Sequence, residues 1–236
     1  MSGLKRSVLV TGASSGIGRA VAKELLRQGY FVFGTSRECN QFETSHSHFL
    51  PVKMDFSKVA LLAEQAKQLQ VEHPDISVIV FCAGYGRFGS LEQFSYQQIN
   101  SLMTVNFTAQ AVLARAFVPS FKKKGRADLI FMGSESALQG RRQGAVYCAS
   151  KFAVRGFSQA LREECAKSQV KVTLINPGMV KSEFFDQLDF EPGDDDNNYI
   201  LPEDLAAAVN YILMTRPGIL IDELVINPVN KRVKFK

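Results

Sequence analysis

The chain has 236 residues, of which 46% are hydrophobic and 22% are charged, and its formal net charge is +5. Its length and composition are those of an ordinary globular protein, enough for one large α/β domain. The basic clusters at residues 122–126 and 231–236 come without a helix-turn-helix, zinc or RNA-binding motif, which argues against nucleic acid as a partner. No run of about 18 apolar residues is present to span a membrane.

Short apolar segments alternate with segments of helical periodicity along the whole chain. Most of the apolar segments are continuous, which is typical of strands buried on both faces of a parallel sheet. The predicted strands lie at residues 7–12, 30–36, 49–55, 76–84, 127–134, 170–178 and 222–227. Between the first two, apolar residues recur at helical spacing until Gly29 ends the predicted helix. This alternation predicts a Rossmann-type, doubly wound α/β fold, with a seven-stranded, mostly parallel sheet and helices on both faces.

No linker or internal repeat divides the chain, so we expect one domain over residues 1–236. Residues 182–200 form the one irregular region, because proline, glycine and an acidic run interrupt the periodicity there. A long loop in a compact domain is usually functional, and we expect this one to be a substrate loop.

A glycine loop, TGASSGIG, occupies residues 11–18 between the first strand and the first helix. Gly12 permits the tight turn, Gly16 allows a phosphate to approach the backbone, and Gly18 allows the helix to pack close to the sheet. The start of the helix would then bind a pyrophosphate. The alternative is an ordinary glycine-rich turn. A P-loop is excluded, because no Gly-Lys-Ser/Thr follows.

Tyr147 and Lys151 lie four residues apart in a mostly apolar segment, and therefore on one helix face. Free tyrosine has a pKa near 10, too high for a base at neutral pH. A nearby ammonium favours the phenolate, so we expect Lys151 to lower the pKa of Tyr147. The alternative is that Tyr147 packs in the core while Lys151 reaches solvent.

The spacing TGxxxGxG, together with Tyr-x-x-x-Lys, resembles the short-chain dehydrogenase/reductase family. The resemblance extends from residue 8 to about residue 227, with the motifs in the family's order. Asn106 matches the helix asparagine of the family, and Ser134 precedes Tyr147 at the usual interval. The sequence departs from the family at Cys82, which replaces an asparagine, and at Ser182, which replaces a threonine.

This resemblance implies a catalytic tetrad of Asn106, Ser134, Tyr147 and Lys151. Tyr147 would be the general acid for reduction and the general base for oxidation. Ser134 would bind the substrate oxygen, Lys151 would hold the nicotinamide ribose, and Asn106 would position a water that connects Lys151 to solvent.

The resemblance also implies a dinucleotide site. Asp55 would contact the adenine, with Phe56 beside it, and Ser182 would contact the nicotinamide carboxamide. The full set of predicted cofactor residues is Gly12, Ser14, Ser15, Gly16, Ile17, Gly18, Ser36, Arg37, Asp55, Phe56, Cys82, Ala83, Gly84, Tyr147, Lys151, Pro177, Gly178, Val180 and Ser182.

The end of the second predicted strand indicates which dinucleotide binds. Enzymes that prefer NAD carry an acidic residue there, whereas this chain has Ser36 followed by Arg37. A hydroxyl and a guanidinium suit a 2′-phosphate, so we expect NADP(H) and, with it, the reductive direction. If the strand ended one or two residues later, Glu38 could approach the ribose and favour NAD.

These features predict an oxidoreductase that transfers hydride between NADP(H) and a small-molecule carbonyl/alcohol substrate, acting as a carbonyl reductase. One alternative is a catalytically idle, dinucleotide-binding redox sensor. Another is a sugar-nucleotide epimerase, whose chains are longer and carry a further substrate domain. Family members are commonly dimers or tetramers, so we expect a homodimer or a homotetramer.

We expect residues 85–88, 138–142 and 179–199 to line the substrate pocket, because ligands bind at the carboxyl ends of the strands. Their arginines, Arg87, Arg141 and Arg142, could clamp a substrate carboxylate or simply face solvent.

The remaining motifs carry less information. Residues 46–48, His-Ser-His, lack an evident third ligand, so we expect no metal site. The C-terminal KRVKFK is either an oligomer contact or a solvated tail. Four scattered cysteines and an N-terminus without a secretory signal favour a reduced, cytoplasmic protein.

Overall fold

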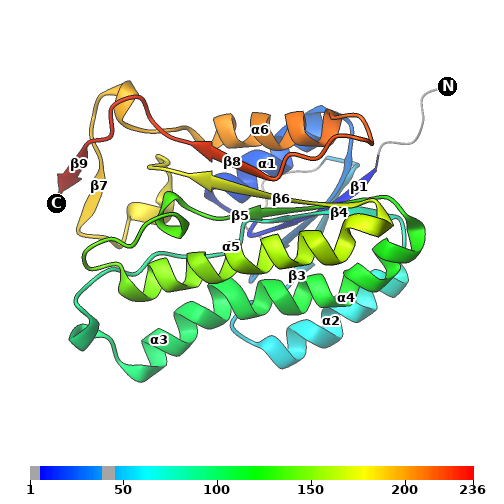
Figure 1. The fold of residues 1–236 in the computed structure, drawn as a ribbon, viewed down its shortest axis with the longest axis horizontal. Helices are drawn as coiled ribbons and strands as arrows, with labels where there is room; N and C mark the ends of the chain where they lie inside the picture. Colours follow the sequence, from blue (N-terminus) through cyan, green and yellow to red (C-terminus); the bar gives the residue numbers. More distant parts are fainter. Residues whose placement is uncertain (1–5, 39–45) are drawn as a thin grey trace.

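The computed structural model describes residues 6–38 and 46–236 and contains a seven-stranded parallel sheet (Figure 1). Its spatial order is β3-β2-β1-β4-β5-β6-β8, and every neighbouring pair is parallel. The strands are β1 (Ser7–Thr11), β2 (Phe31–Ser36), β3 (Phe49–Lys53), β4 (Ile76–Phe81), β5 (Ala127–Met132), β6 (Val170–Pro177) and β8 (Glu223–Ile226). All seven predicted strands are present, and the predicted Rossmann-type fold is confirmed.

Helices cover both faces of this sheet (Figure 1). One face carries α1 (Gly16–Arg27) and α6 (Pro202–Met214), and the other carries α2 (Val59–Glu72), α4 (Ala109–Lys124) and α5 (Ala145–Cys165). Alternate side chains of β1 fill the two resulting cores: Leu9 packs on the side of α2, α4 and α5, whereas Val8 and Val10 pack on the side of α1 and α6. The strands therefore read as continuous apolar runs in the sequence.

The chain changes direction in the sheet between β1 and β4, so the carboxyl ends of these strands border a crevice. The Thr11 side chain ties the two ends together, because its Oγ1 accepts hydrogen bonds from the backbone N–H groups of Cys82 and Ala83, each at 3.0 Å. The glycine loop and the segment after β4 consequently lie side by side at this edge.

The helical region after β4 is not one continuous α-helix. Helix α3 (Tyr96–Met103) passes through a π-helical turn, Thr104–Thr108, before α4 begins. Such turns are rare and often lie at functional sites. Here the turn contains Asn106, whose side chain is completely buried.

A second, two-stranded sheet was not predicted. Strand β7 (Phe190–Pro192) lies within the region expected to be irregular, and β9 (Val233–Phe235) lies within the C-terminal tail. The two strands pair antiparallel at one end of the molecule (Figure 1). The tail is therefore a strand rather than a free extension.

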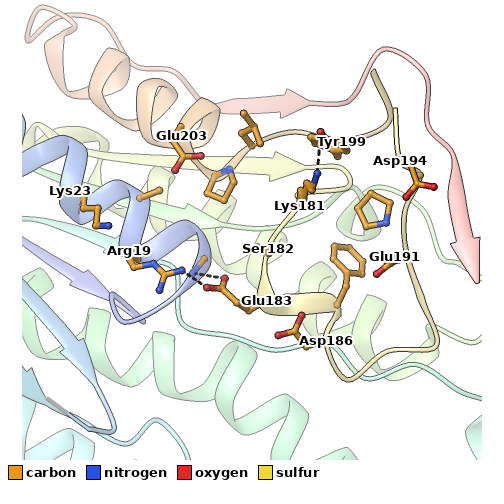
Figure 2. A pocket seen from close by; sticks show the side chains of 17 residues that line it. Arg19, Lys23, Lys181, Ser182, Glu183, Asp186, Glu191, Asp194, Tyr199 and Glu203 are labelled. Atoms are coloured by element: carbon orange, nitrogen blue, oxygen red, sulfur yellow. Dashed lines mark hydrogen bonds and ion pairs between the residues drawn. The ribbon is translucent and has the colours of Figure 1, made fainter. Parts of the chain in front are cut away.

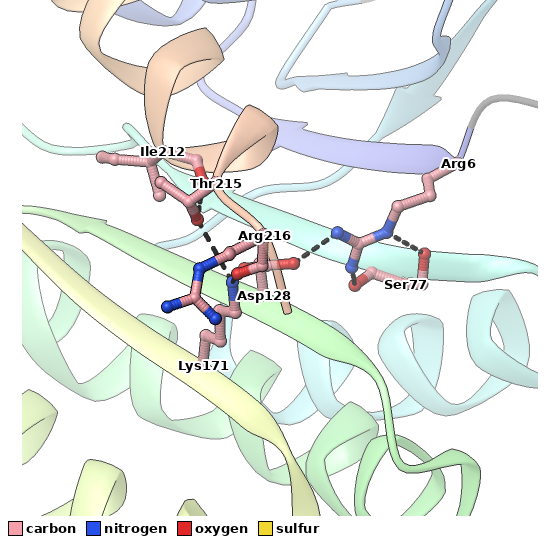
Figure 3. Close-up of polar contacts among 7 residues, drawn as sticks. All are labelled: Arg6, Ser77, Asp128, Lys171, Ile212, Thr215 and Arg216. Carbon is pink, nitrogen blue, oxygen red and sulfur yellow. Dashed lines mark hydrogen bonds and ion pairs between the residues drawn. The ribbon is translucent and has the colours of Figure 1, made fainter. Parts of the chain in front are cut away.

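At the amino ends of the strands, a partly buried ion pair joins Arg6 to the buried Asp128 of β5 (Figure 3). Arg6 also donates hydrogen bonds from Nε to the Ser77 hydroxyl, at 3.0 Å, and from Nη2 to the Ser77 carbonyl, at 2.7 Å. Nearby, Lys171 Nζ donates to Thr215 Oγ1 at 3.2 Å, which ties β6 to the end of α6. These contacts fix the strands at the end opposite the crevice.

Candidate active site

The glycine loop has the close approaches that its sequence predicts. Gly16 has a φ of +46°, which an L side chain rarely adopts. A Cβ on Gly18 would lie 2.2 Å from the carbonyl oxygen of Gly12. Glycine at position 18 therefore lets α1 start directly against the turn, with its first backbone N–H groups directed outward.

One of these N–H groups already binds an anion of the protein. Gly16 N donates to Glu183 Oε2 at 3.1 Å, and Glu183 also forms an ion pair with Arg19 of α1 (Figure 2). Burial raises the pKa of Glu183, but backbone hydrogen bonds and the Arg19 charge outweigh that effect and hold the pKa below its ordinary value. Glu183 was not identified from the sequence, although it directly follows the predicted cofactor residue Ser182.

Two of the proposed catalytic residues, Ser134 and Tyr147, form what is called here the catalytic pair, and they lie where β5 ends and α5 begins. Tyr147 is buried, and the Ser134 side chain lies near enough to its phenol to oppose the effect of burial on the pKa of Tyr147. The backbone N–H of Ser134 donates to Asn176 Oδ1 at 3.1 Å, and its Oγ accepts from the N–H of Ser136 at 3.1 Å. These bonds hold the serine hydroxyl beside the phenol.

The prediction that Lys151 lowers the pKa of Tyr147 is wrong. Burial raises the pKa of Tyr147 to about 12, and the hydrogen bond with Ser134 only partly opposes it. Lys151 Nζ lies 5.9 Å from the centre of the phenol ring and donates to the Met132 carbonyl at 3.0 Å. Burial also lowers the pKa of Lys151 to about 8. Loss of hydration, which periodicity does not reveal, is the largest cause of both pKa shifts.

The Asn106 side chain is held by three hydrogen bonds to protein groups. Its Nδ2 donates to the Tyr85 carbonyl at 3.0 Å and to Ser150 Oγ at 3.2 Å, and its Oδ1 accepts from Tyr85 N at 3.0 Å. Ser150 Oγ in turn donates to the carbonyl of Tyr147 at 2.7 Å. Asn106 thus fixes the segment after β4 against α5, and the water-positioning role expected of it stays a prediction.

A cavity of about 350 Å³ brings the two predicted sites together. Ser134, Tyr147 and Lys151 line it. The predicted cofactor residues that line it with them are Ile17, Cys82, Gly84, Pro177, Gly178, Val180 and Ser182. Burial raises the pKa of the Cys82 thiol to about 12, against the opposing charge of Lys151, so the cysteine that departs from the family pattern is a neutral group.

The predicted adenosine end of the site lies at the ends of β2 and β3. Strand β2 ends at Ser36, as predicted, so the later strand end that would favour Glu38 is not observed. Ser36 is buried and Arg37 is exposed. The side chain of Ser57 donates to Asp55 Oδ1 at 2.7 Å and lowers the pKa of Asp55, with smaller contributions that include the charge of Arg37.

The three segments predicted to line the substrate pocket do so in part. Tyr85, Phe88, Arg141 and Arg142 border the cavity, together with six residues of the third segment, Met179, Val180, Ser182, Phe184, Phe185 and Phe190. Arg87 instead lies over the Phe94 ring, 5.8 Å from its centre. Arg141 Nη2 lies 3.9 Å from a carboxylate oxygen of Glu135.

The structure adds cavity residues that the sequence did not reveal. Glu135 borders the cavity directly after Ser134, and Lys231, Val233 and Phe235 reach it from the C-terminal tail. The alternation of charged and apolar residues in KRVKFK is the signal that could have identified a strand there.

The expectations of no metal site and no membrane-spanning segment concern the histidines at 46 and 48 and the helices. His46 and His48 pack edge to face, with ring centres 5.6 Å apart, and residues 6–38 and 46–236 contain no group of three potential metal ligands. Across the same ranges, none of the helices is long and apolar enough to cross a bilayer.

Comparison with known proteins identifies the family. The family model for the short chain dehydrogenases matches residues 6–192, so the chain belongs to the short-chain dehydrogenase/reductase family of oxidoreductases. The chain is 27% identical over 239 residues to the NADP-dependent 3-hydroxy acid dehydrogenase of Schizosaccharomyces pombe. This alignment covers 94% of this chain and 92% of the relative.

Solved structures of the family superimpose closely. An alcohol dehydrogenase from the archaeon Thermococcus sibiricus, complexed with 5-hydroxy-NADP, has a TM-score of 0.87 and 26% identity over 97% of this chain and 98% of its own. The closed form of a serine dehydrogenase complexed with NADP+ has a TM-score of 0.84 and 26% identity over 93% and 94% of the two chains.

Proposed function

We propose that this protein is an NADP(H)-dependent carbonyl reductase that interconverts a small carbonyl compound and its alcohol. The observation that carries the proposal is that Ser134 and Tyr147 lie together on the wall of a cavity that extends to Ile17 of the glycine loop. The whole chain would act as one catalytic domain, with residues 182–200 as its substrate loop.

The residues at the start of α1 fit a dinucleotide. The Glu183 carboxylate on Gly16 N stands in for an anionic oxygen, which indicates that this helix terminus accepts negative charge. The pyrophosphate would lie there, Arg37 would face the 2′-phosphate, and Lys151 and Ser182 would hold the nicotinamide end. When bound, the reduced nicotinamide supplies a hydride to the carbonyl carbon.

The chain's own residues would supply the proton and the polarisation. The Ser134 hydroxyl would donate a hydrogen bond to the carbonyl oxygen. Tyr147 would give its proton to the same oxygen while the carbon gains the hydride, so the carbonyl becomes an alcohol and the phenol becomes a phenolate. The Lys151 ammonium would stabilise that phenolate, and the aromatic side chains around the pair would exclude water.

The protonation state of Tyr147 supports the reductive direction. With its pKa raised to about 12 by burial, Tyr147 carries its proton at physiological pH, which is the form that reduction starts from. Oxidation of an alcohol starts from the phenolate instead.

A preference for NADP(H) rests on Ser36 and Arg37 at the end of β2. A guanidinium pairs well with a phosphate group, whereas a carboxylate at this position would repel it. The names of the similar proteins from Schizosaccharomyces pombe and Thermococcus sibiricus, which specify NADP or a derivative of it, support the same choice.

The test is a screen of aldehydes and ketones that follows the absorbance of NADPH. The proposal predicts turnover of at least one carbonyl class. If the protein binds NADPH tightly but turns over no carbonyl or alcohol in a broad panel, the redox-sensor alternative replaces the proposal. Sedimentation of the same preparation tests the expected homodimer or homotetramer, and its distribution between cell fractions tests the cytoplasmic location.

A further inference from the structure

The C-terminal strand β9 presents one face to the cavity of the catalytic pair. Lys231, Val233 and Phe235 all border that cavity. They alternate with Arg232 and Lys234, and alternate residues of a strand point to the same side. Val233 and Phe235 are therefore cavity-facing members of a strand whose other face is basic.

The basic face holds the strand against the acidic part of the 182–200 segment. Lys234 Nζ lies 3.0 Å from Asp194 Oδ1, and Lys236 Nζ lies 3.4 Å from Glu191 Oε2. The short backbone ladder to β7 adds hydrogen bonds from Gly193 N to the Arg232 carbonyl, at 3.0 Å, and from Lys236 N to the Asp189 carbonyl, at 2.9 Å. Charge and ladder together fix which face of β9 looks inward.

Before β9 begins, the tail is anchored twice more. The buried Asn198 donates from Nδ2 to the Asn230 carbonyl at 2.7 Å. Lys231 forms an ion pair with Glu135, the neighbour of the catalytic serine. This pair engages the lysine just before β9 begins, and the cavity-facing residues of β9 itself, Val233 and Phe235, are apolar.

An aromatic track connects Tyr147 to this strand. The Phe88 ring lies 4.9 Å from that of Tyr147 and 5.1 Å from that of Phe190, centre to centre. Phe190 is paired in register with Phe235 across the two-stranded sheet. Phe235 is nevertheless 77% exposed and Val233 is 42% exposed. Apolar side chains that border a cavity and remain exposed indicate a surface that a ligand covers.

We propose that β9 is the outer wall of the substrate pocket and that Val233 and Phe235 select carbonyl substrates with an extended apolar group. The reacting carbonyl would lie at Ser134 and Tyr147, and the apolar group would follow the aromatic track to β9. The proposal rests on the proposed reductase function and adds its substrate class: lipophilic ketones or aldehydes in preference to short ones.

The experiment compares 2-butanone with 2-decanone, using NADPH and three forms of the protein. The wild type is compared with the double variant Val233→Ala/Phe235→Ala and with a control, Val229→Ala. Val229 precedes β9 and is 92% exposed, so it offers the same truncation away from the cavity. We expect the ratio of kcat/KM for decanone to that for butanone to fall about tenfold in the double variant, because two large apolar side chains lose their contact with the ligand. The control should retain the wild-type ratio.

If the double variant keeps the wild-type ratio of kcat/KM for 2-decanone to that for 2-butanone, whether or not both values fall, the proposal is overturned. A binding measurement separates its failure from that of the reductase function. Calorimetric titration with 2-decanol should give a Kd about tenfold weaker for the double variant than for wild type or Val229→Ala. If no ketone turns over but this difference in Kd is found, the wall stands and the reductase function fails. If ketones turn over and the Kd values agree, the wall fails and the reductase function stands.

Discussion

Replacing Glu183 by glutamine should strengthen the binding of NADPH. Glu183 places a carboxylate on Gly16 N, at 3.1 Å, where the pyrophosphate of the cofactor would bring further negative charge. Glutamine retains the size of the side chain and an oxygen that can accept the same hydrogen bond. The substitution therefore removes charge while leaving the local packing in place.

The magnitude follows from the exposure of the ion pair. Two like charges about 4 Å apart repel by about 1 kcal/mol in water and by about 4 kcal/mol near a protein surface of lower effective dielectric constant. The side chains of Glu183 and Arg19 are each 46% exposed, so solvent screens them and the lower value applies. Release of Arg19 to face the phosphates adds a few tenths of a kcal/mol. Together these effects correspond to a Kd for NADPH about five- to tenfold tighter.

The assay is a fluorescence titration of NADPH at low salt, repeated at about 0.5 M salt, where screening should remove most of the gain. Glu203→Gln is the matched control, because Glu203 of α6 lines the same surface pocket as Arg19 and Glu183 (Figure 2). It should bind NADPH as the wild type does. If Glu183→Gln binds NADPH no more tightly than the wild type at low salt, the carboxylate does not compete with the cofactor and this reasoning is refuted.

Three further predictions concern single side chains. The wild type should bind NADPH at least about tenfold more tightly than NADH, and Arg37→Ala should remove most of that preference, because a charge-assisted contact is lost. An unchanged ratio of the two Kd values would show that Arg37 does not contact the 2′-phosphate. Burial lowers the pKa of Lys151 from 10.5 to about 8, so between these pH values the unfolded chain binds a proton that the folded protein does not. In urea titrations, the free energy of unfolding of the wild type should therefore rise with pH in that window relative to that of Lys151→Met, by up to about 3 kcal/mol. The variant Lys167→Met, which changes an exposed lysine, is the control and should follow the wild-type pH profile. Parallel profiles for Lys151→Met and wild type would contradict the lowered pKa of Lys151. Arg6→Ala leaves the buried Asp128 without its cation (Figure 3) and should lower the free energy of unfolding by about 3–5 kcal/mol, whereas a loss below about 1 kcal/mol would show that the pair is not important for stability.

Much of the fold could be predicted because its signals are local. Continuous apolar runs reflect burial on both faces, and the strand end at Ser36 follows from the residues that come next. The glycine loop was equally readable, since Gly18 cannot carry a Cβ so close to the Gly12 carbonyl. Each of these features depends on only a few neighbouring residues.

The features that sequence reasoning missed depend on residues far apart in the chain. Strands β7 and β9 are only three residues long, so the alternation in the C-terminal tail is a weak signal, and each strand is stabilised by its partner. The contact between Glu183 and Gly16 likewise appears only after the 182–200 segment returns to α1. The pKa of Tyr147 was predicted in the wrong direction, because burial is a property of the whole fold and not of a residue pair.

The central claim is that the Tyr147 hydroxyl supplies the proton for carbonyl reduction while contributing little to holding the cofactor. The most direct test is Tyr147→Phe, measured by NADPH titration and by turnover of the best ketone found in the screen. We expect the Kd for NADPH to stay within about twofold of wild type, and kcat to fall at least about 100-fold, because general-acid catalysis is worth that much. Turnover within tenfold of wild type, with NADPH still bound, would contradict the account.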